Sequence, residues 1–235
     1  MNRGLKSILT MYRRDKFNWL LLPWLILLSS FTVNLVVAFS INRGGGEQSF
    51  TTGGLLSIII YMFIVGMISV YWTFNFALSL CISRRDYFTG SGIAFLAMSV
   101  FHGALLTVAT SIEQAIGGWF GMHFFVIPYT TDGPFWQTFA VYFTALLFAG
   151  YGGFVSGSLS RRYGKRGNFL LYGGAFILGG AFTTIASLRG WWVPIFDWIS
   201  GLQISLQGVC LLLLALAVLF ATLSWLMLRR SSARA

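Results

Sequence analysis

Charged side chains are scarce in this sequence. Only 9% of its 235 residues are Asp, Glu, Lys or Arg, whereas 57% are hydrophobic. A soluble domain carries about 25% charged residues, so this chain has too few of them to cover a water-exposed surface. The sequence excludes an ordinary soluble domain and predicts an integral membrane protein whose solvent is mostly lipid.

Cysteines, metal ligands and nucleotide-binding motifs are also few or missing. Cys81 and Cys210 both fall in apolar runs, so we expect two buried free thiols rather than a disulfide framework. His102, Glu113 and His123 offer too few convergent ligands for a metal site. The sequence contains no G-x-x-x-x-G-K-[ST] loop to hold nucleotide phosphates. If the protein uses ATP, another chain therefore hydrolyses it.

What the chain does contain is a series of long apolar runs. A helix of roughly 20 apolar residues crosses the hydrocarbon core of a bilayer. We expect six such spans, at about 17–41, 53–82, 91–116, 135–160, 169–188 and 206–228. The sequence predicts an all-α membrane protein with an amphipathic surface helix (1–16), a six-helix transmembrane domain (17–228) and a short tail (229–235).

The basic residues gather on one side of these predicted spans. The first 16 residues hold five of the 16 Lys and Arg, the loop between spans 2 and 3 two, the loop between spans 4 and 5 four, and the tail three. The opposite side holds only Arg43 and Arg189. The positive-inside rule places both termini in the cytoplasm, as an even number of spans requires. The net charge of +10 is thus explained without nucleic acid.

The first 16 residues form an amphipathic segment. Four apolar side chains recur at i, i+3, i+4 and i+7 and share one helical face, among basic neighbours. Such a helix lies along the membrane surface. The alternative is a solvated positive flank to the first span. The residues assigned to this interfacial helix are Leu5, Ile8, Leu9, Tyr12, Arg13 and Arg14.

Two ionisable residues, His102 and Glu113, fall within the third span. Glu113 lies at its outer end, and an ionisable group in a span is a functional hypothesis by default. The alternative is that Glu113 reaches headgroups or water at the interface. His102 lies eleven residues earlier, about 16 Å along the axis, so the two side chains cannot touch within one straight helix. For His102 we expect packing against a neighbouring span.

Small residues recur every four positions in the fourth span. They let two helices approach closely, so we interpret them as a packing signal. They are Ala145, Ala149, Gly153 and Gly157. The glycines of the fifth span have the same interpretation. The connector 189–205 is too apolar for a solvated loop and too short to span, which favours an interfacial or re-entrant helix, or an ordinary aromatic belt.

The predicted cytoplasmic turn between spans 2 and 3 is the most informative segment. The positive-inside bias explains its arginines, but not Tyr87 and Phe88 after an exposed Asp86. Aromatic residues beside arginines on a short exposed loop are typical of a protein interface. The candidate interface consists of Ser83, Arg84, Arg85, Asp86, Tyr87 and Phe88.

Along nearly its whole length the chain resembles permease subunits of bacterial ABC transporters of the type-2 exporter class. The resemblance rests on a basic N-terminal helix before six spans and on ALSLCISRRDYFTG between spans 2 and 3. It also rests on SIEQAIGGWFGMHFFVIPYTTDGP after span 3, which is similar to an E-x-x-x-GGW…FF segment in permeases from Gram-positive bacteria. Cys81 stands where glycine is usual in that family.

The resemblance implies a subunit of the bacterial cytoplasmic membrane that pairs as a homo- or heterodimer to form a translocation path. Separate ATPase subunits would bind ATP and Mg, and this chain would bind no cofactor and catalyse no reaction. Ser83–Phe88 would be the coupling helix, flanked by Leu5–Arg14. No substrate-binding motif of the family can be matched, so the substrate stays open.

Two other classes of function stay open. One is a membrane sensor or scaffold that transports nothing. The other is an intramembrane hydrolase, which needs a serine nucleophile and a histidine base on facing helices. His102 and Ser156 fall in neighbouring predicted spans, but the sequence around Ser156 is not the short G-x-S-G arrangement of rhomboid-like enzymes. Co-purification with an ATPase distinguishes a permease from both.

Overall fold

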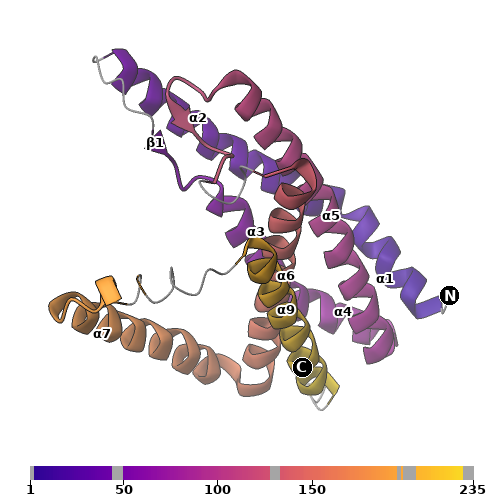
Figure 1. Ribbon diagram of the computed structural model, residues 1–235. Helices are drawn as coiled ribbons and strands as arrows, with labels where there is room; N and C mark the ends of the chain where they lie inside the picture. Colours follow the sequence, from indigo (N-terminus) through magenta and orange to yellow (C-terminus); the bar gives the residue numbers. More distant parts are fainter. Residues whose placement is uncertain (1–2, 44–49, 128–132, 195–196, 198–204, 230–235) are drawn as a thin grey trace.

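The computed structural model describes residues 3–43, 50–127, 133–194, 197 and 205–229, and nearly all of it is helical (Figure 1). Three five-residue π-helical turns continue or join the helices: η1 (Phe17–Leu21), η2 (Ser69–Thr73) and η3 (Phe169–Gly173). The helices are α1 (Arg3–Arg14), α2 (Leu22–Arg43), α3 (Leu56–Ile68), α4 (Phe74–Ser79), α5 (Arg84–Ile116), α6 (Phe135–Asn168), α7 (Gly174–Leu188) and α9 (Leu206–Arg229).

Among the described residues, five helical segments are long and apolar enough to cross a membrane. They are Phe17–Arg43, Leu56–Ser79, Arg84–Ile116, Phe135–Gly164 and Leu206–Arg229. The prediction of an all-α, multi-pass membrane protein is confirmed at this level. The fifth predicted span corresponds to η3 and α7, and α7 is apolar but only 15 residues long.

Two segments predicted as loops are helical instead. The predicted charged turn at 83–90 is the start of α5, because Ser83 caps that helix: its Oγ accepts a hydrogen bond of 3.1 Å from the backbone N–H of Asp86. The predicted basic loop at 161–168 continues α6, which kinks at Gly164 (φ 68°). Charge alone is a poor sign of a loop where helices extend beyond the bilayer.

The turn between α4 and α5 also corrects the prediction for Cys81. Its thiol is exposed rather than buried, because the helix ends two residues before it. Cys81 has φ 57°, in the left-handed region that glycine adopts without strain. A glycine at this position, as the family resemblance implies, would therefore suit the turn better.

The core of the bundle is the crossing of α3 and α6. A Cβ added at Gly153 would overlap the backbone carbonyl of Phe63, and one at Gly157 would lie 2.7 Å from the carbonyl oxygen of Met67. A Cβ added at Gly66 would likewise overlap the backbone carbonyl of Gly150. The two backbones therefore touch without intervening side chains, as small residues permit. Of the other predicted packing residues, Ala149 is buried and Ala145 half-buried.

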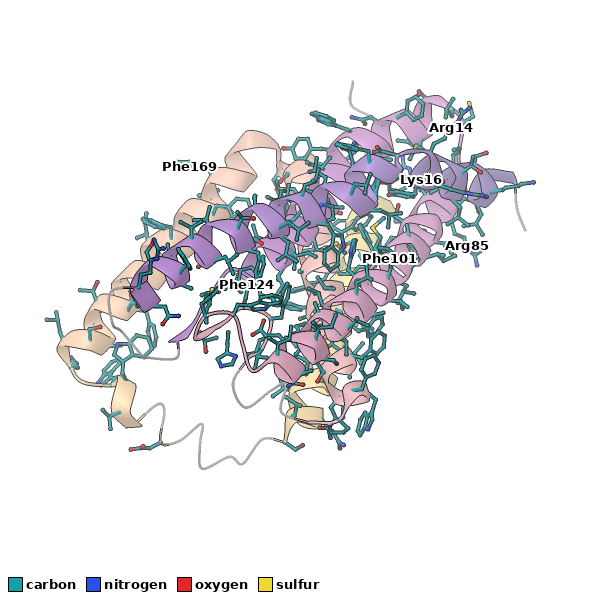
Figure 2. All side chains as sticks on the ribbon, turned by 90° about the horizontal axis from the view of Figure 1, so that it is seen from above. Arg14, Lys16, Arg85, Phe101, Phe124 and Phe169 are labelled. Atoms are coloured by element: carbon teal, nitrogen blue, oxygen red, sulfur yellow. The ribbon has the colours of Figure 1, made fainter. Side chains whose placement is uncertain are left out.

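The helix ends gather at two opposite ends of the bundle (Figure 1). At one end, Arg84 at the start of α5 donates hydrogen bonds to the carbonyls of Leu228 and Arg229 at the end of α9. Figure 2 shows Arg14, Lys16 and Arg85 at this end. At the other end, β1 (Phe50–Thr51) pairs in parallel with β2 (Met122–His123).

α7 leaves the bundle after α6 and projects away from it (Figure 1). Its large apolar side chains are exposed, and Phe176 retains 83% of its surface. A Cβ added at any of the four glycines of this segment would meet nothing within 4 Å outside the helix's own backbone. Tyr172 in η3 reaches back to the sulfur of Met67, at 3.7 Å. The predicted re-entrant connector at 189–205 lies mostly outside the described residues.

The α3–α6 contact predicts an unusual response to alanine. Gly→Ala in a helix ordinarily stabilises by about 0.5–1 kcal/mol. Gly153→Ala should instead destabilise by about 1–3 kcal/mol, because its Cβ has no space. Gly179→Ala in α7 is the matched control and should not destabilise. Thermal unfolding of the detergent-solubilised variants measures both, and equal stability of the two would contradict the close contact.

Candidate functional site

α1 packs on the first turns of α5 through its apolar face. Ile8 is fully buried, and a Cβ added at Gly90 would lie 2.6 Å from its Cγ2. The Tyr12 hydroxyl and the Ser91 hydroxyl share a hydrogen bond of 3.0 Å. Burial raises the pKa of Tyr12 above its ordinary value, which keeps this hydroxyl protonated. The predicted apolar face of the N-terminal helix is therefore occupied by α5.

The aromatic pair at the start of α5 corrects the sequence prediction. Tyr87 is fully buried: its hydroxyl donates to the carbonyl of Ser69 at 2.7 Å, and its ring packs edge-on against Phe74. Phe88 is half-buried against Phe154. The expectation that both rings are exposed on a turn is wrong, because the helix has already begun and turns them into the bundle.

The charged residues of the same segment have different surroundings. Arg84 is half-buried and bonds the end of α9, as described above. Asp86 is half-buried beside Gly4 of α1. Ser83 and Arg85 are exposed, and Arg85 lines the mouth of a groove of about 700 Å³ between α5, α6 and α9. Only part of the predicted interface is thus accessible to a partner.

His102 joins α5 to the first span. Its Nδ1 accepts a hydrogen bond of 3.0 Å from Trp24 Nε1, and its Nε2 lies 3.1 Å from the carbonyl oxygen of Trp19. These partners assign the proton to Nε2. Pro23 explains the site, because it lacks the N–H that would bond to Trp19 in an α-helix. Both ring nitrogens are used here, so neither serves Ser156 as a base.

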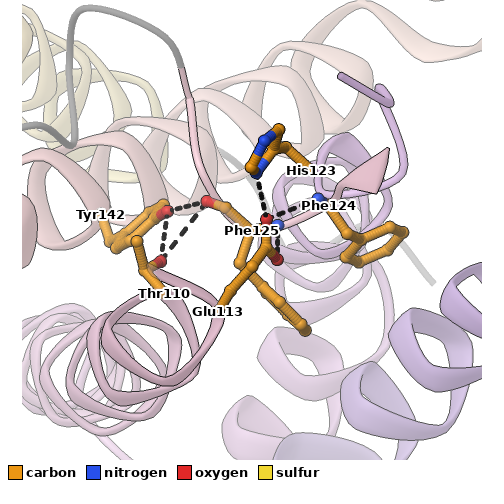
Figure 3. Close-up of polar contacts among 6 residues, drawn as sticks. All are labelled: Thr110, Glu113, His123, Phe124, Phe125 and Tyr142. Carbon is orange, nitrogen blue, oxygen red and sulfur yellow. Dashed lines mark hydrogen bonds and ion pairs between the residues drawn. The ribbon is translucent and has the colours of Figure 1, made fainter. Parts of the chain in front are cut away.

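Glu113 holds the loop that follows α5 (Figure 3). Its carboxylate is fully buried, and its two oxygens accept hydrogen bonds from the backbone N–H groups of Phe124 and Phe125, at 2.9 and 2.8 Å. His123 Nδ1 lies 3.4 Å from Oε1. The interfacial alternative for Glu113, contact with headgroups or water, is wrong because the returning loop covers the side chain.

Tyr142 and Thr110 add a second attachment to the same loop. The Tyr142 hydroxyl donates to the carbonyl of Phe125 at 2.6 Å and lies 2.9 Å from Thr110 Oγ1. The backbone N–H of Thr52 also donates to the carbonyl of His123, at 2.9 Å. We call Thr110, Glu113, Phe124, Phe125 and Tyr142 the outer clasp.

Sequence reasoning singled out only Glu113 from the outer clasp. The usable signal was the E-x-x-x-GGW…FF pattern, whose first and last members are bonded to each other here. Gly117 and Gly118, with φ 81° and 95°, turn the chain back, and both donate to the carbonyl of Glu113. Thr110 and Tyr142 carried no such signal.

Comparisons with protein-family models, with curated proteins and with solved structures found no match. Within the described part of the chain, no three His, Cys, Asp or Glu side chains come together as a metal site would require. The arrangement of its polar residues is suited to holding helices and loops in register.

The outer clasp predicts a local effect of Glu113→Gln. A glutamine side chain offers one acceptor where the carboxylate offers two, so one buried N–H loses its partner at a cost of about 1–3 kcal/mol. Hydrogen exchange at Phe124 and Phe125 should become about tenfold faster. Ser111→Ala is the control, because the Ser111 hydroxyl donates within α5 to the carbonyl of Thr107. Unchanged exchange in Glu113→Gln would contradict the clasp.

Proposed function

We propose that this chain is the transmembrane permease subunit of an ATP-driven exporter, with separate ATPase subunits docking at the turn between α4 and α5. The observation that carries the proposal is the set of attachments at the start of α5. Arg84 bonds the end of α9, Tyr87 bonds η2, and Gly90 receives Ile8 of α1. A displacement at this one turn is therefore transmitted to several spans.

Transport requires such a connection between a small docking surface and the whole bundle. An inward-open and an outward-open state must differ in what they bind, and a partner that favours one state shifts the population toward it. ATP and Mg would act in the partner, since this sequence has no phosphate-binding loop. The family resemblance further implies a second permease subunit, identical or related, and leaves the substrate open.

The accessible part of the docking surface is Ser83 and Arg85, together with the exposed basic residues of α1, among them Arg13. A positively charged rim favours an acidic cleft on the partner and speeds their encounter. Tyr87 and Phe88 act inside the bundle, where they carry movement of the turn to α6 and η2.

The proposal includes six crossings with both termini in the cytoplasm. The start of α9 lies beside the start of α6, since Leu206 and Trp136 line one hollow. The end of α9 lies beside the start of α5. Between the end of α6 and the start of α9, the chain must therefore come back from one end of the bundle to the other. The segment 169–188 has 20 residues, which is about 30 Å as a helix and enough for that crossing.

Cysteine labelling tests this topology. In a chain freed of Cys81 and Cys210, single cysteines at 162 and 189 should be labelled from opposite sides, with 162 on the cytoplasmic side. The reason is that η3 and α7 lie between the two positions. Control cysteines at 13 and 43 should divide in the same way across the first span. Labelling of 162 and 189 from the same side would contradict the six-span topology and indicate five spans.

The coupling proposal predicts a contrast between two neighbouring positions. Arg85→Glu reverses an exposed charge and should lower co-purification of an ATPase and vesicle transport without loss of thermal stability. Tyr87→Ala removes a fully buried ring and should destabilise the fold by about 3–5 kcal/mol. Pull-down from native membranes, vesicle transport and thermal unfolding separate the two effects.

Arg43→Glu, at the opposite end of the bundle, is the control for the charge reversal. It should leave ATPase binding unchanged. If Arg85→Glu matches this control in both binding and transport, the turn is only a topology signal, and the sensor or scaffold function is favoured instead.

A further inference from the structure

A groove runs between α1 and the helices of the second span. An inner hollow of about 500 Å³ separates α1 and η1 from α3 and η2. An outer hollow of about 920 Å³ continues it between α1 and α4. Met11, Asp15 and Phe76 line both hollows, so the two hollows adjoin each other. We call the two together the α1–α4 groove.

The two hollows differ in chemistry. The inner one is lined mainly by aromatic and aliphatic side chains, including Trp19 and Trp72. The outer one has five polar or charged lining residues (Lys6, Ser7, Thr10, Arg14 and Asp15) beside the apolar Met11, Phe76 and Leu80. Trp72 is 75% exposed, so its ring is available for contact. A basic, polar end beside an apolar end matches an amphiphile whose head is anionic and whose tail is hydrocarbon.

Both walls of the inner hollow contain π-helical turns. η1 supplies Trp19 and η2 supplies Trp72. Turns of this kind are rare, and they occur frequently at functional sites. Because η1 and η2 lie on facing walls of the inner hollow, they point to the α1–α4 groove as a functional site, independently of its charge pattern.

The charges of the outer hollow suit one phosphate group. Lys6, Thr10 and Arg14 follow each other at four-residue spacing on α1, and the outer two lie about 12 Å apart along the axis. Their long side chains can meet over Thr10. Neither cation forms an ion pair with an acid of the described chain.

Asp15 is the acid of the groove, and its carboxylate accepts hydrogen bonds of 2.8 and 3.0 Å from the side-chain amide of Asn18. Two cations and one carboxylate leave one net positive charge. That charge complements the single negative charge of a phosphodiester and falls short of what a polyphosphate headgroup needs.

We propose that the α1–α4 groove binds one anionic glycerophospholipid, of the phosphatidylglycerol type. Its phosphate lies between Lys6 and Arg14, and an acyl chain runs past Phe76 onto Trp19 and Trp72. The groove lies at the basic end of the bundle, where headgroups of the cytoplasmic leaflet are found if the charge distribution sets the orientation. A bound lipid would bridge α1 to the second span without any ATPase.

Native mass spectrometry and thermal unfolding of the full chain in non-ionic detergent test the proposal. Phosphatidylglycerol should be retained at one molecule per chain and raise the melting temperature, and salt should weaken its binding. Diacylglycerol lacks the phosphate, and glycerol phosphate lacks the tails, so neither should stabilise. Equal stabilisation by diacylglycerol would mean unspecific lipid contact, and equal stabilisation by glycerol phosphate would mean a phosphate site; either result overturns the proposal.

Variants locate the binding. Lys6→Gln with Arg14→Gln should weaken phosphatidylglycerol binding at least about tenfold, because charge-assisted hydrogen bonds are lost. Arg13→Gln with Lys16→Gln removes the same charge from residues that do not line the groove, and should have little effect. Trp72→Ala should weaken lipid binding while preserving the fold, since this ring is exposed. Equal binding by all of these variants would also overturn the proposal.

Discussion

A bilayer offers no water to the backbone polar groups that leave a regular helix, so each of them must find a partner within the protein. In this chain α5 supplies several of those partners. His102 bonds Trp19 at the π-helical turn before Pro23, and Tyr87 bonds Ser69 in the second π-helical turn. Arg84 bonds the last carbonyls of α9, and Glu113 receives the amides of the outer loop. The first two π-helical turns, the end of α9 and the loop after α5 are thus all bonded to one long helix.

This arrangement attaches both ends of the helix to other parts of the protein. Its first turn is attached to α1, η2 and α9, at the end where the basic residues gather. Its last turn holds the outer clasp, which ties the loop after it to α6 through Tyr142. A helix of 33 residues is about 50 Å long. In the proposed permease, a displacement at the first turn would be carried along this helix to the outer clasp.

Long apolar runs made the membrane helices predictable, because length and hydropathy are local properties of the sequence. The start of α5 was predictable in principle, since Ser83 and Asp86 stand at the cap and third positions of a helix start. The burial of Tyr87 was not, because it depends on η2, α4 and α6 together. Gly153 and Gly157 repeat at a fixed spacing and were found as a packing signal, whereas Gly66, a single glycine on the facing helix, has no pattern to reveal it.

The same constraint explains why α7 can leave the bundle. Within the described residues of this helix the backbone bonds are internal, and Thr183 and Thr184 return their hydroxyls to carbonyls one turn earlier. It therefore needs no polar side chain from α5. Its exposed apolar residues carry no cost in lipid, where helix association is driven by packing rather than by the hydrophobic effect. An apolar helix with glycines on it can pack beside lipid or beside another helix, so its sequence does not specify a neighbour. Among the described helices, α1, α6 and α9 are joined to α5 by specific hydrogen bonds, whereas the position of α7 depends on what surrounds the bundle.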